Sequence, residues 1–433
     1  MSSHESQHLL RGILPYCPPI VVKTDDRFEL HKNSIEWFNK RRCHAKLVRI
    51  NIELLCEVDI TDYTLDNIEL YVRSNISLHD IEPLKILYIN QRVTNVNIEY
   101  NQDPAVMEVL FSLLNSIRKL DIEYSNLSHW MAHVKQLGPC LHELSIQEGT
   151  THFAMIKSIT ELSPYLEKLS LRNWSHMPGV SDNSNNLQSI ANNCPHLRSL
   201  YKELLCYNLS SEADADLTAF AEKCPQLEEL TLHCSQLTDQ SVIALAQHCP
   251  RLQKLKLRWC KLTVASLIAL SERGLPLEEL DIIPRIPIPT AEIAAQCAHA
   301  LSRIRELSID GSVVDMRYAI QYMTGLRYIE LDSSEDHLLV PHLLLLLQGQ
   351  CCAGLKYLYI CPDSSITPPQ LCELVTECYN LHTLYIGKPT CSSDSELVEL
   401  AHNCPHLQEV TLDFSSSEVT EEGVLALAAH CRQ

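Results

Sequence analysis

Apolar positions along most of the chain follow one spacing, L-x-x-L-x-L, in which Ile or Val can replace Leu. Residues 252–257 read LQKLKL, and copies recur from residue 117 to residue 412 at intervals of 22 to 31 residues. Within each copy the last apolar residues alternate with polar ones, as expected for a short strand with one buried face. The pattern therefore predicts a series of short strands with one strand in each interval.

A second apolar pattern lies between these strands. In residues 238–250, TDQSVIALAQHCP, the apolar positions Val242, Leu245, Ala246 and Cys249 follow the i, i+3, i+4, i+7 spacing of an amphipathic helix. Thr238 or Asp239 is the expected N-cap, and Pro250 the expected stop. A strand and a helix recurring with this period are typical of leucine-rich repeats. We therefore expect an α/β leucine-rich-repeat solenoid, a horseshoe with parallel strands on its concave face and helices on its convex face.

The repeats divide the chain into three parts. Residues 115–433 hold the regular copies. Residues 46–114 hold weaker copies whose spacing is too short for a full helix, so we expect irregular repeats that form an N-terminal cap, because an end repeat otherwise exposes an apolar face. Residues 1–45 show no repeat. The weaker copies are LVRINI at 47–52, LDNIEL at 65–70 and LKILYI at 84–89.

Composition limits the classes of partner and compartment. Formal net charge is −19, which argues against binding to nucleic-acid phosphates or to anionic membranes. No secretory signal precedes the repeats, and the most apolar run, 337–348, is too short to span a bilayer and contains Pro341. We expect a protein of the cytoplasm, the nucleus or both, in which the 19 cysteines stay reduced.

The cysteines raise the question of metal binding or catalysis. Cys249 occupies the last apolar position of its predicted helix and equivalent cysteines recur in other repeats, so we interpret them as small core residues. Zinc-type C-x₂-C pairs, phosphate-binding loops and G-x-S-x-G motifs do not occur, and H-E-x-x-H is matched once, by HESQH at residues 4–8, outside the repeats. We therefore expect no catalytic residues, no metal and no cofactor, and a protein that is not an enzyme. A nucleophile and base brought together from distant repeats would leave no signal in the sequence.

Two stretches carry a resemblance to a known family. CPQLEELTLHCSQLTDQSVIALAQHC and CPRLQKLKLRWCKLTVASLIALSERG resemble the cysteine-containing leucine-rich repeats of F-box/LRR proteins and of AMN-type LRR proteins. The resemblance implies substrate recognition in an SCF-type ubiquitin ligase, with a Skp-type adaptor and a cullin as partners. The F-box that normally precedes such repeats is matched in residues 1–45 only by ILPYCPP and SIEWFNKRR, so no adaptor-binding residue is carried over.

Two other functions remain open. A divergent or absent F-box would fit a free-standing LRR scaffold or adaptor, as in AMN-type regulators. A regulator of a GTPase or a nuclease, similar to RanGAP or ribonuclease inhibitor, is a further alternative, although the repeats of those proteins lack the Cys-Pro pattern.

The candidate binding residues follow from the alternation of side chains along each strand. The third, fifth and seventh positions of L-x-x-L-x-L-x face away from the leucine core, on the concave side. They form either an ordinary solvated surface or a recognition surface, where acidic strips beside tyrosines would suit a basic, extended segment of a substrate protein. The predicted partner-binding residues are Lys254, Lys256, Arg258, Glu279, Asp281, Asp310, Tyr328, Glu330, Asp332, Tyr357, Tyr359, Tyr385 and Asp413.

Overall fold

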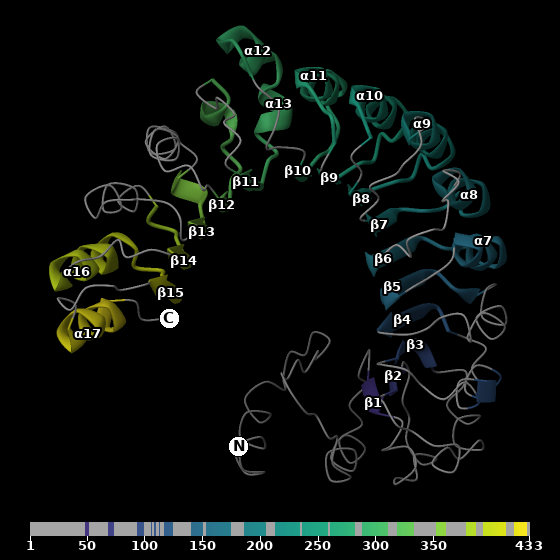
Figure 1. Ribbon diagram of the computed structural model, residues 1–433, viewed down its shortest axis with the longest axis horizontal. Helices are drawn as coiled ribbons and strands as arrows, with labels where there is room; N and C mark the ends of the chain where they lie inside the picture. The colour runs from purple at the N-terminus through teal and green to yellow at the C-terminus, as the bar shows by residue number, and fades with distance from the viewer. Residues whose placement is uncertain are drawn as a thin grey trace, which may run out of the picture. The chain divides into compact units, whose positions relative to one another are not determined.

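The structure is a computed structural model in which strands and helices alternate along the chain (Figure 1). The residues that it describes are 48–51, 68–72, 93–98, 105, 108–109, 112, 117–123, 140–149, 153–174, 186–204, 213–233, 236–258, 260–281, 288–310, 318–332, 352–360, 378–386, 393–412 and 420–430. Residues 1–45, where an F-box was sought, lie outside this part.

Two compact units make up the chain. The first comprises residues 1–181 and 189–204, and the second comprises residues 182–188 and 205–433. The division falls within helix α8 (Asn186–Asn193).

The strands of the first unit are parallel and pair in chain order. Helices α7 (Phe153–Leu162) and α8 follow strands β5 and β6, as the repeat pattern predicts. The strands are β1 (Val48–Asn51), β2 (Ile68–Val72), β3 (Val93–Ile98), β4 (Lys119–Glu123), β5 (Glu143–Gly149), β6 (Lys168–Trp174) and β7 (Ser199–Leu204).

The repeat frame near the N-terminus differs from the prediction. The strand that pairs with both β2 and β4 is residues 93–98, whereas the predicted copy at 84–89 lies outside the described residues. These residues, VTNVNI, keep the repeat spacing, but valine rather than leucine occupies the first two apolar positions, Val93 and Val96. In β2 the buried residues are Leu70 and Val72, so its frame begins two residues later than predicted. The apolar positions of β3 are all buried: Val93, Val96 and Ile98.

The second unit holds two groups of parallel strands, each in chain order. Its strands form one face and its helices the opposite face (Figure 1). The strands are β8 (Glu229–His233), β9 (Lys254–Arg258) and β10 (Glu279–Asp281), then β11 (Glu306–Asp310), β12 (Tyr328–Asp332), β13 (Tyr357–Ile360), β14 (Thr383–Ile386) and β15 (Glu409–Leu412). This repeated arrangement is that of an α/β leucine-rich-repeat solenoid, as predicted.

The segments that lie between the strands vary in length. Where the interval between copies is shortest, the described residues form a short 3₁₀ turn, η5 (Ile320–Tyr322), and a similar turn, η6 (Cys352–Gly354), precedes β13. The helices are α9 (Ala213–Lys223), α10 (Asp239–His248), α11 (Val264–Arg273), α12 (Ala291–Gln296), α13 (Ala298–Leu301), α16 (Asp394–Asn403) and α17 (Glu421–His430).

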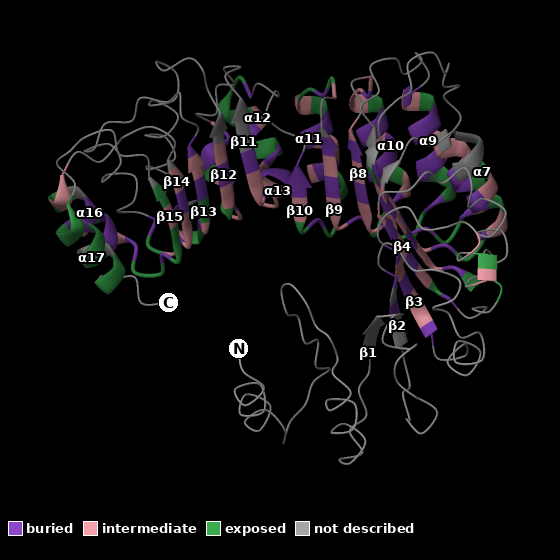
Figure 2. Cartoon of the chain, turned by 60° about the horizontal axis from the view of Figure 1, so that its bottom comes forward, coloured by how far each residue is buried: buried purple, intermediate pink, exposed green. Residues whose placement is uncertain are grey.

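Leucine positions line the interior between strands and helices. In β9 and the turn before it, Leu252, Leu255 and Leu257 are buried, while Lys254 and Lys256 between them are half-buried. Leu255 lies in register with Leu280 on the next strand. Figure 2 shows the same alternation of buried and partly exposed residues on other strands. Each leucine row is therefore completed by a neighbouring repeat, which is the source of hydrophobic stabilisation in a solenoid.

A shift of register separates β10 from β11. Leu280 pairs with Ile304, whereas the repeat pattern alone would align it with Leu307, three residues further on. This interval contains residues 282–290, whose three prolines at 284, 287 and 289 oppose a helix, and α12 begins directly after them at Ala291. From β11 onward the regular register returns, with Leu307 opposite Ile329.

Carboxylates at the starts of three helices bind the cap of the next helix. Asp239 accepts hydrogen bonds from the Thr263 backbone N–H (2.8 Å), the Thr263 hydroxyl (2.5 Å) and the Ser266 hydroxyl (2.5 Å). The Thr263 hydroxyl in turn accepts from the Ala265 N–H, which makes Thr263 the N-cap of α11. The same arrangement joins Asp214 to Thr238 and Ser241, and Asp394 to Thr420.

These hydrogen bonds change the acidity of the carboxyl groups. Burial raises the pKa of Asp239, but the bonds from Ser266 and Thr263 outweigh it and hold the pKa below its ordinary value of 3.8. The pKa of Asp214 is lowered in the same way, against burial, by Ser241 and Thr238. The folded state therefore favours the ionised carboxylate over the protonated acid.

Cysteines form a second contact between repeats. The Cys249 thiol lies 3.7 Å from the carbonyl oxygen of Ala221, and the Cys194 thiol lies 3.5 Å from that of Ser163. These carbonyls belong to the end of the preceding helix or the turn after it, where backbone acceptors lack a helical partner. Burial raises the pKa of the Cys249 thiol to about 12, so it stays protonated and serves as a core residue that donates a weak hydrogen bond.

We predict that Asp239→Asn lowers the free energy of unfolding by about 1–2 kcal/mol at pH 7, because three hydrogen bonds lose their charged acceptor. The lowered pKa makes this contribution present above the unfolded-state pKa and lost as pH falls through the folded-state pKa. The difference between wild type and variant should therefore shrink between pH 5 and pH 3, as followed by urea unfolding and circular dichroism. The control is Glu272→Gln, which removes the charge of an exposed carboxylate on α11. An equal difference at both ends of this pH range would contradict the assignment.

Candidate functional site

The predicted partner-binding residues lie on the strand face of the second unit. Nine of them have described side chains, on β9, β10, β12, β13 and β14. For Arg258, Asp310 and Asp332 the structure describes only the backbone, which lies at the end of β9, β11 and β12. Asp413 lies outside the described residues.

Strand register brings the four predicted tyrosines together. Tyr328 on β12 lies opposite Tyr357 on β13, and Tyr359 on β13 lies opposite Tyr385 on β14. The rings of Tyr359 and Tyr385 are stacked, with centroids 4.2 Å apart and planes within 7° of each other. The rings of Tyr328 and Tyr357 are tilted at 40°, with centroids 6.3 Å apart. We call these four residues the tyrosine face.

The tyrosine face combines apolar area with partial exposure. Tyr357 is 44% exposed, and the other three tyrosines are half-buried. Glu330, also half-buried, lies opposite Tyr359 in the register of β12 and β13. Its carboxylate forms no ion pair with any residue in the described part of the chain. The repeat pattern predicts an acidic side chain beside tyrosines, and Glu330 and Tyr359 do lie on adjacent strands.

The predicted basic stripe on β9 is already paired within the chain. Lys254 Nζ lies 2.8 Å from a Glu229 carboxylate oxygen. Lys256 Nζ contacts the carboxylate of Glu279 and lies 3.2 Å from that of Glu306. Burial opposes the charge on Lys256, but hydrogen bonds and attraction from both glutamates outweigh it and raise the pKa of Lys256 above 10.5. Lys256 thus joins β9, β10 and β11 across the shift of register.

Asp281 differs from the expectation of a solvent-facing acidic strip. It is only 8% exposed, at the end of the short strand β10, directly before the interval in which the register shifts. Glu279 and Glu306 are paired with Lys256, so the described acidic side chains of β10 and the third position of β11 are either buried or neutralised within the chain. Glu330 in β12 and Glu409 in β15 form no ion pair with any residue in the described part of the chain.

Sequence reasoning missed the partners that neutralise these charges. Glu229 occupies the third position of β8, and the third positions of β8, β9 and β10 read Glu, Lys, Glu. In the first unit, Lys119, Glu143 and Lys168 alternate in the same way, with Lys168 Nζ 3.1 Å from a Glu143 oxygen. Alternating sign at one repeat position was the available signal, because parallel strands place these positions side by side.

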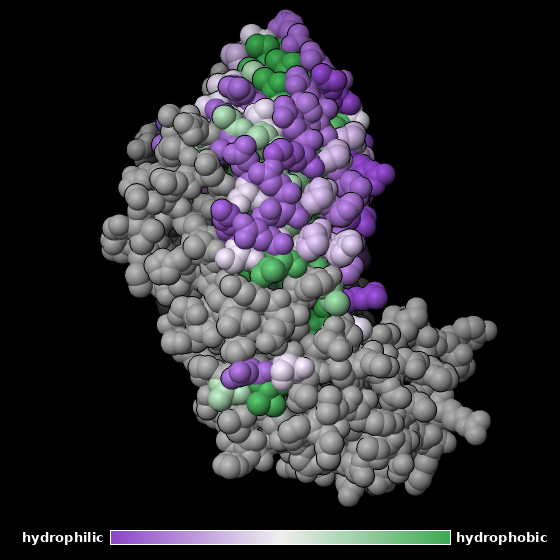
Figure 3. Space-filling model, turned by 90° about the vertical axis from the view of Figure 1, so that its right-hand side faces the viewer, coloured by the Kyte–Doolittle hydropathy of each residue, from purple (hydrophilic) through white to green (hydrophobic). Residues whose placement is uncertain are grey.

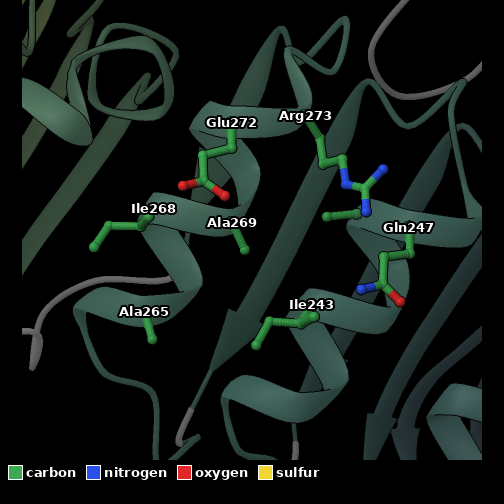
Figure 4. A pocket seen from close by; sticks show the side chains of 8 residues that line it. Ile243, Gln247, Ala265, Ile268, Ala269, Glu272 and Arg273 are labelled. Carbon is green, nitrogen blue, oxygen red and sulfur yellow. The ribbon is translucent and has the colours of Figure 1, made fainter.

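A small open pocket lies away from the strand face, between α10 and α11. Its volume is about 290 Å³, and its side chains come from the two neighbouring helices (Figure 4). Glu272 and Arg273 are its only ionisable lining residues, and they do not form a nucleophile–base pair. It is lined by Ile243, Ala246, Gln247, Ala265, Ile268, Ala269, Glu272 and Arg273.

Other kinds of site were sought over the described residues. These residues contain no group of three or more His, Cys, Asp or Glu side chains arranged to hold a metal ion. None of their helices is both long and apolar enough to cross a membrane. On the side shown in Figure 3 the described surface is mainly hydrophilic, with hydrophobic residues in small separate groups. The tyrosine face is therefore the strongest candidate site in the described part of the chain.

Comparisons with known proteins give structural likenesses alone. No protein-family model and no curated protein matches the sequence. The crystal structure of the Rad7–Elc1 complex of yeast is similar with 16% identity over 90% of this chain and 84% of that chain, at a TM-score of 0.49. An internalin (InlF) of Listeria monocytogenes is similar with 15% identity over 80% of this chain and 87% of that chain, at a TM-score of 0.40. The crystal structure of the TLR13–ssRNA13 complex is similar with 12% identity over 88% of this chain and 58% of that chain, at a TM-score of 0.32. These values carry no argument about function, and the fold follows from the repeat geometry.

We predict that Lys256→Met lowers the free energy of unfolding by about 1–3 kcal/mol, because it leaves two partly buried carboxylates facing each other. Lys254→Met should cost less, about 0–1 kcal/mol, because its ion pair with Glu229 is more exposed. Urea unfolding at pH 7 measures both. Adding Glu279→Gln and Glu306→Gln to Lys256→Met should restore part of the loss. Equal costs for the two lysines, or no rescue, would contradict the bridging role of Lys256.

Proposed function

We propose that the protein works by binding other proteins, with the tyrosine face as the central contact. The single observation that carries this proposal is the cluster of Tyr328, Tyr357, Tyr359 and Tyr385 on three adjacent strands. Tyrosine supplies large, rigid contact area with a polar end, and it is enriched at the energetic centres of protein interfaces. The carboxylate of Glu330, which lies opposite Tyr359, adds a charge that selects among partners.

The chemistry of the partner follows from these groups. Adjacent strands are about 4.8 Å apart, so an extended segment lying across β12 to β14 spans roughly 10 Å, or about three residues. A basic side chain within that segment would pair with Glu330 and stack against a tyrosine ring. The partner is therefore a substrate protein with a short extended segment that carries one basic residue, a narrower requirement than a long basic run.

The cellular role that we propose is substrate recognition in an SCF-type ubiquitin ligase. The resemblance of the Cys-Pro-containing repeats to F-box/LRR proteins supports this role, and the adaptor contact would then belong to residues 1–45. A free-standing LRR scaffold or adaptor is the alternative, favoured by the weak match of those residues to an F-box. An LRR regulator of a GTPase or a nuclease is a third possibility. All three roles act through binding and need no catalytic group.

A reducing compartment, cytoplasmic or nuclear, is part of the proposal. Most of the cysteines in the described part of the chain are buried. Burial raises the pKa of Cys224 to about 12 and that of Cys297 to about 11, which keeps these thiols protonated. This state supports a packing role and argues against their use as nucleophiles or metal ligands.

We predict that Tyr359→Ala with Tyr385→Ala lowers capture of the specific partners at least about tenfold, because it removes two stacked rings from the centre of the interface. Quantitative mass spectrometry after affinity purification from cell extract measures the loss. Tyr165→Ala with Tyr379→Ala is the matched control, since these tyrosines are exposed and lie in turns before strands. Circular dichroism checks that both variants stay folded. An unchanged set of partners in the first variant would refute the assignment of the tyrosine face.

A second experiment separates the ligase role from the scaffold role. The full chain is mixed with a recombinant Skp-type adaptor and cullin, and complexes are resolved by size-exclusion chromatography. Co-elution that is lost when residues 1–45 are deleted supports substrate recognition in a ligase. Separate elution of all components supports the scaffold, and it leaves the tyrosine face as the binding surface in either case.

A further inference from the structure

Basic residues occupy the edge of the second unit at which β11, β12 and β13 begin. Arg305, Arg327 and Lys356 stand at the second position of three consecutive repeats, directly before the third-position residues on the strand face. The Arg327 N–H donates to the Arg305 carbonyl oxygen (2.9 Å), and the Lys356 N–H donates to that of Arg327 (2.9 Å). These bonds fix the three residues at the same level on neighbouring strands. With Arg303, in the turn before β11, we call them the basic edge.

The sign of charge changes at this point along the second unit. In the preceding repeats the same position holds Glu228, Gln253 and Glu278, joined by the same backbone hydrogen bonds. From Arg305 onward it holds positive charge over three repeats. This concentration occurs in a chain whose formal net charge is −19, so the local sign opposes that of the whole protein.

Among the described residues, no carboxylate lies within ion-pair distance of the basic edge, in contrast to the other lysines of the second unit discussed above. Arg303, Arg305, Arg327 and Lys356 form no ion pair with any residue in the described part of the structure. Lys256, by contrast, is held by two glutamates within the same unit. Arg303 also has a buried Nε that finds no hydrogen-bond acceptor among the described residues.

Arg305 is held in place by the backbone. Its Nε donates to the Glu278 carbonyl oxygen (3.0 Å) and its Nη1 to that of Gly325 (2.9 Å). A side chain on Gly325 would overlap the Arg305 guanidinium. Burial lowers the pKa of Arg305, and repulsion from Arg327 and Arg303 lowers it further. Attraction from Glu278 and Glu279 raises it, but does not offset these effects. The positive groups are thus close enough to repel one another, and a bound anion would relieve that repulsion.

We propose that the basic edge binds an acidic or phosphorylated segment of a protein partner. Guanidinium groups on neighbouring strands suit carboxylate or phosphate oxygens, to which they donate charge-assisted hydrogen bonds. A short segment meets only the local positive charge, whereas a long nucleic acid also meets the repulsion of the acidic chain. This proposal rests on the basic edge alone and does not depend on the tyrosine face.

The test uses the full chain and fluorescein-labelled peptides whose binding is followed by anisotropy at 50 mM and 150 mM salt. The probes are a hexaglutamate peptide, a peptide with three phosphoserines, a matched hexaglutamine peptide and a twelve-residue oligothymidine. Wild type should bind the acidic or the phosphorylated peptide and not the glutamine peptide. The tighter of the two anionic peptides identifies the kind of anion that is preferred.

The diagnostic variant is Arg327→Gln with Lys356→Gln, which spares the backbone-bound Arg305. It should weaken anionic-peptide binding roughly tenfold through the loss of two charge-assisted contacts. Arg251→Gln with Arg273→Gln makes the same change of charge at exposed positions elsewhere in the second unit, and should leave the affinity within about twofold. An equal loss in both variants, no binding of either anionic peptide by wild type, or tighter binding of oligothymidine would overturn the proposal.

The tyrosine variant Tyr359→Ala with Tyr385→Ala separates the two proposals. It should keep its affinity for the anionic peptide within about twofold while losing the partners captured from extract. Loss of peptide binding in this variant together with an intact fold would overturn the independence of the basic edge.

Discussion

The structure depends on the alignment of each strand with the strand of the next repeat. A single repeat has too little apolar surface to form a core of its own, so its leucines are buried only when a neighbour supplies the next leucine row. Where the alignment is regular, as between β12 and β13, the carbonyl oxygen of Arg327 accepts N–H groups from two consecutive residues of the following repeat. The side chains of one repeat position then form continuous rows, and every surface property of the strand face follows from these rows.

The contacts between helices extend the same dependence to the opposite face. Asp239 at the start of α10 binds the cap of α11, and Asp214 in the first turn of α9 binds the cap of α10. The starts of α10 and α11 are therefore stabilised by the repeats that precede them. The buried thiols act at the other end of the helices, where they meet carbonyl groups that the helix leaves unpaired.

The sequence was sufficient for the fold and for the composition of the site, because leucine spacing and strand alternation are local properties. Four tyrosines were placed on one face, and register brings them into two contacting pairs. The frame near the N-terminus was misread because β3 uses valine where leucine was sought. The pairing of Lys256 was missed because its partner Glu306 lies fifty residues away in the sequence, and that contact depends on a shift of register which leaves no local signal. The burial of Asp281 beside that shift could not be predicted for the same reason.

The shift of register between β10 and β11 also affects how the second unit responds to mechanical or thermal stress. Regular neighbours such as β12 and β13 are aligned over four residues, whereas in the described part of the chain β10 and the residues before β11 share one isolated bridge between Leu280 and Ile304. Cooperativity in a solenoid passes through nearest-neighbour interfaces, so the weakest interface sets the boundary of a cooperative block. Opening motions that begin in β11–β15 can then end at this boundary, where the ion pair of Lys256 with Glu306 and the hydrogen bond from Arg305 to the Glu278 carbonyl connect the two blocks.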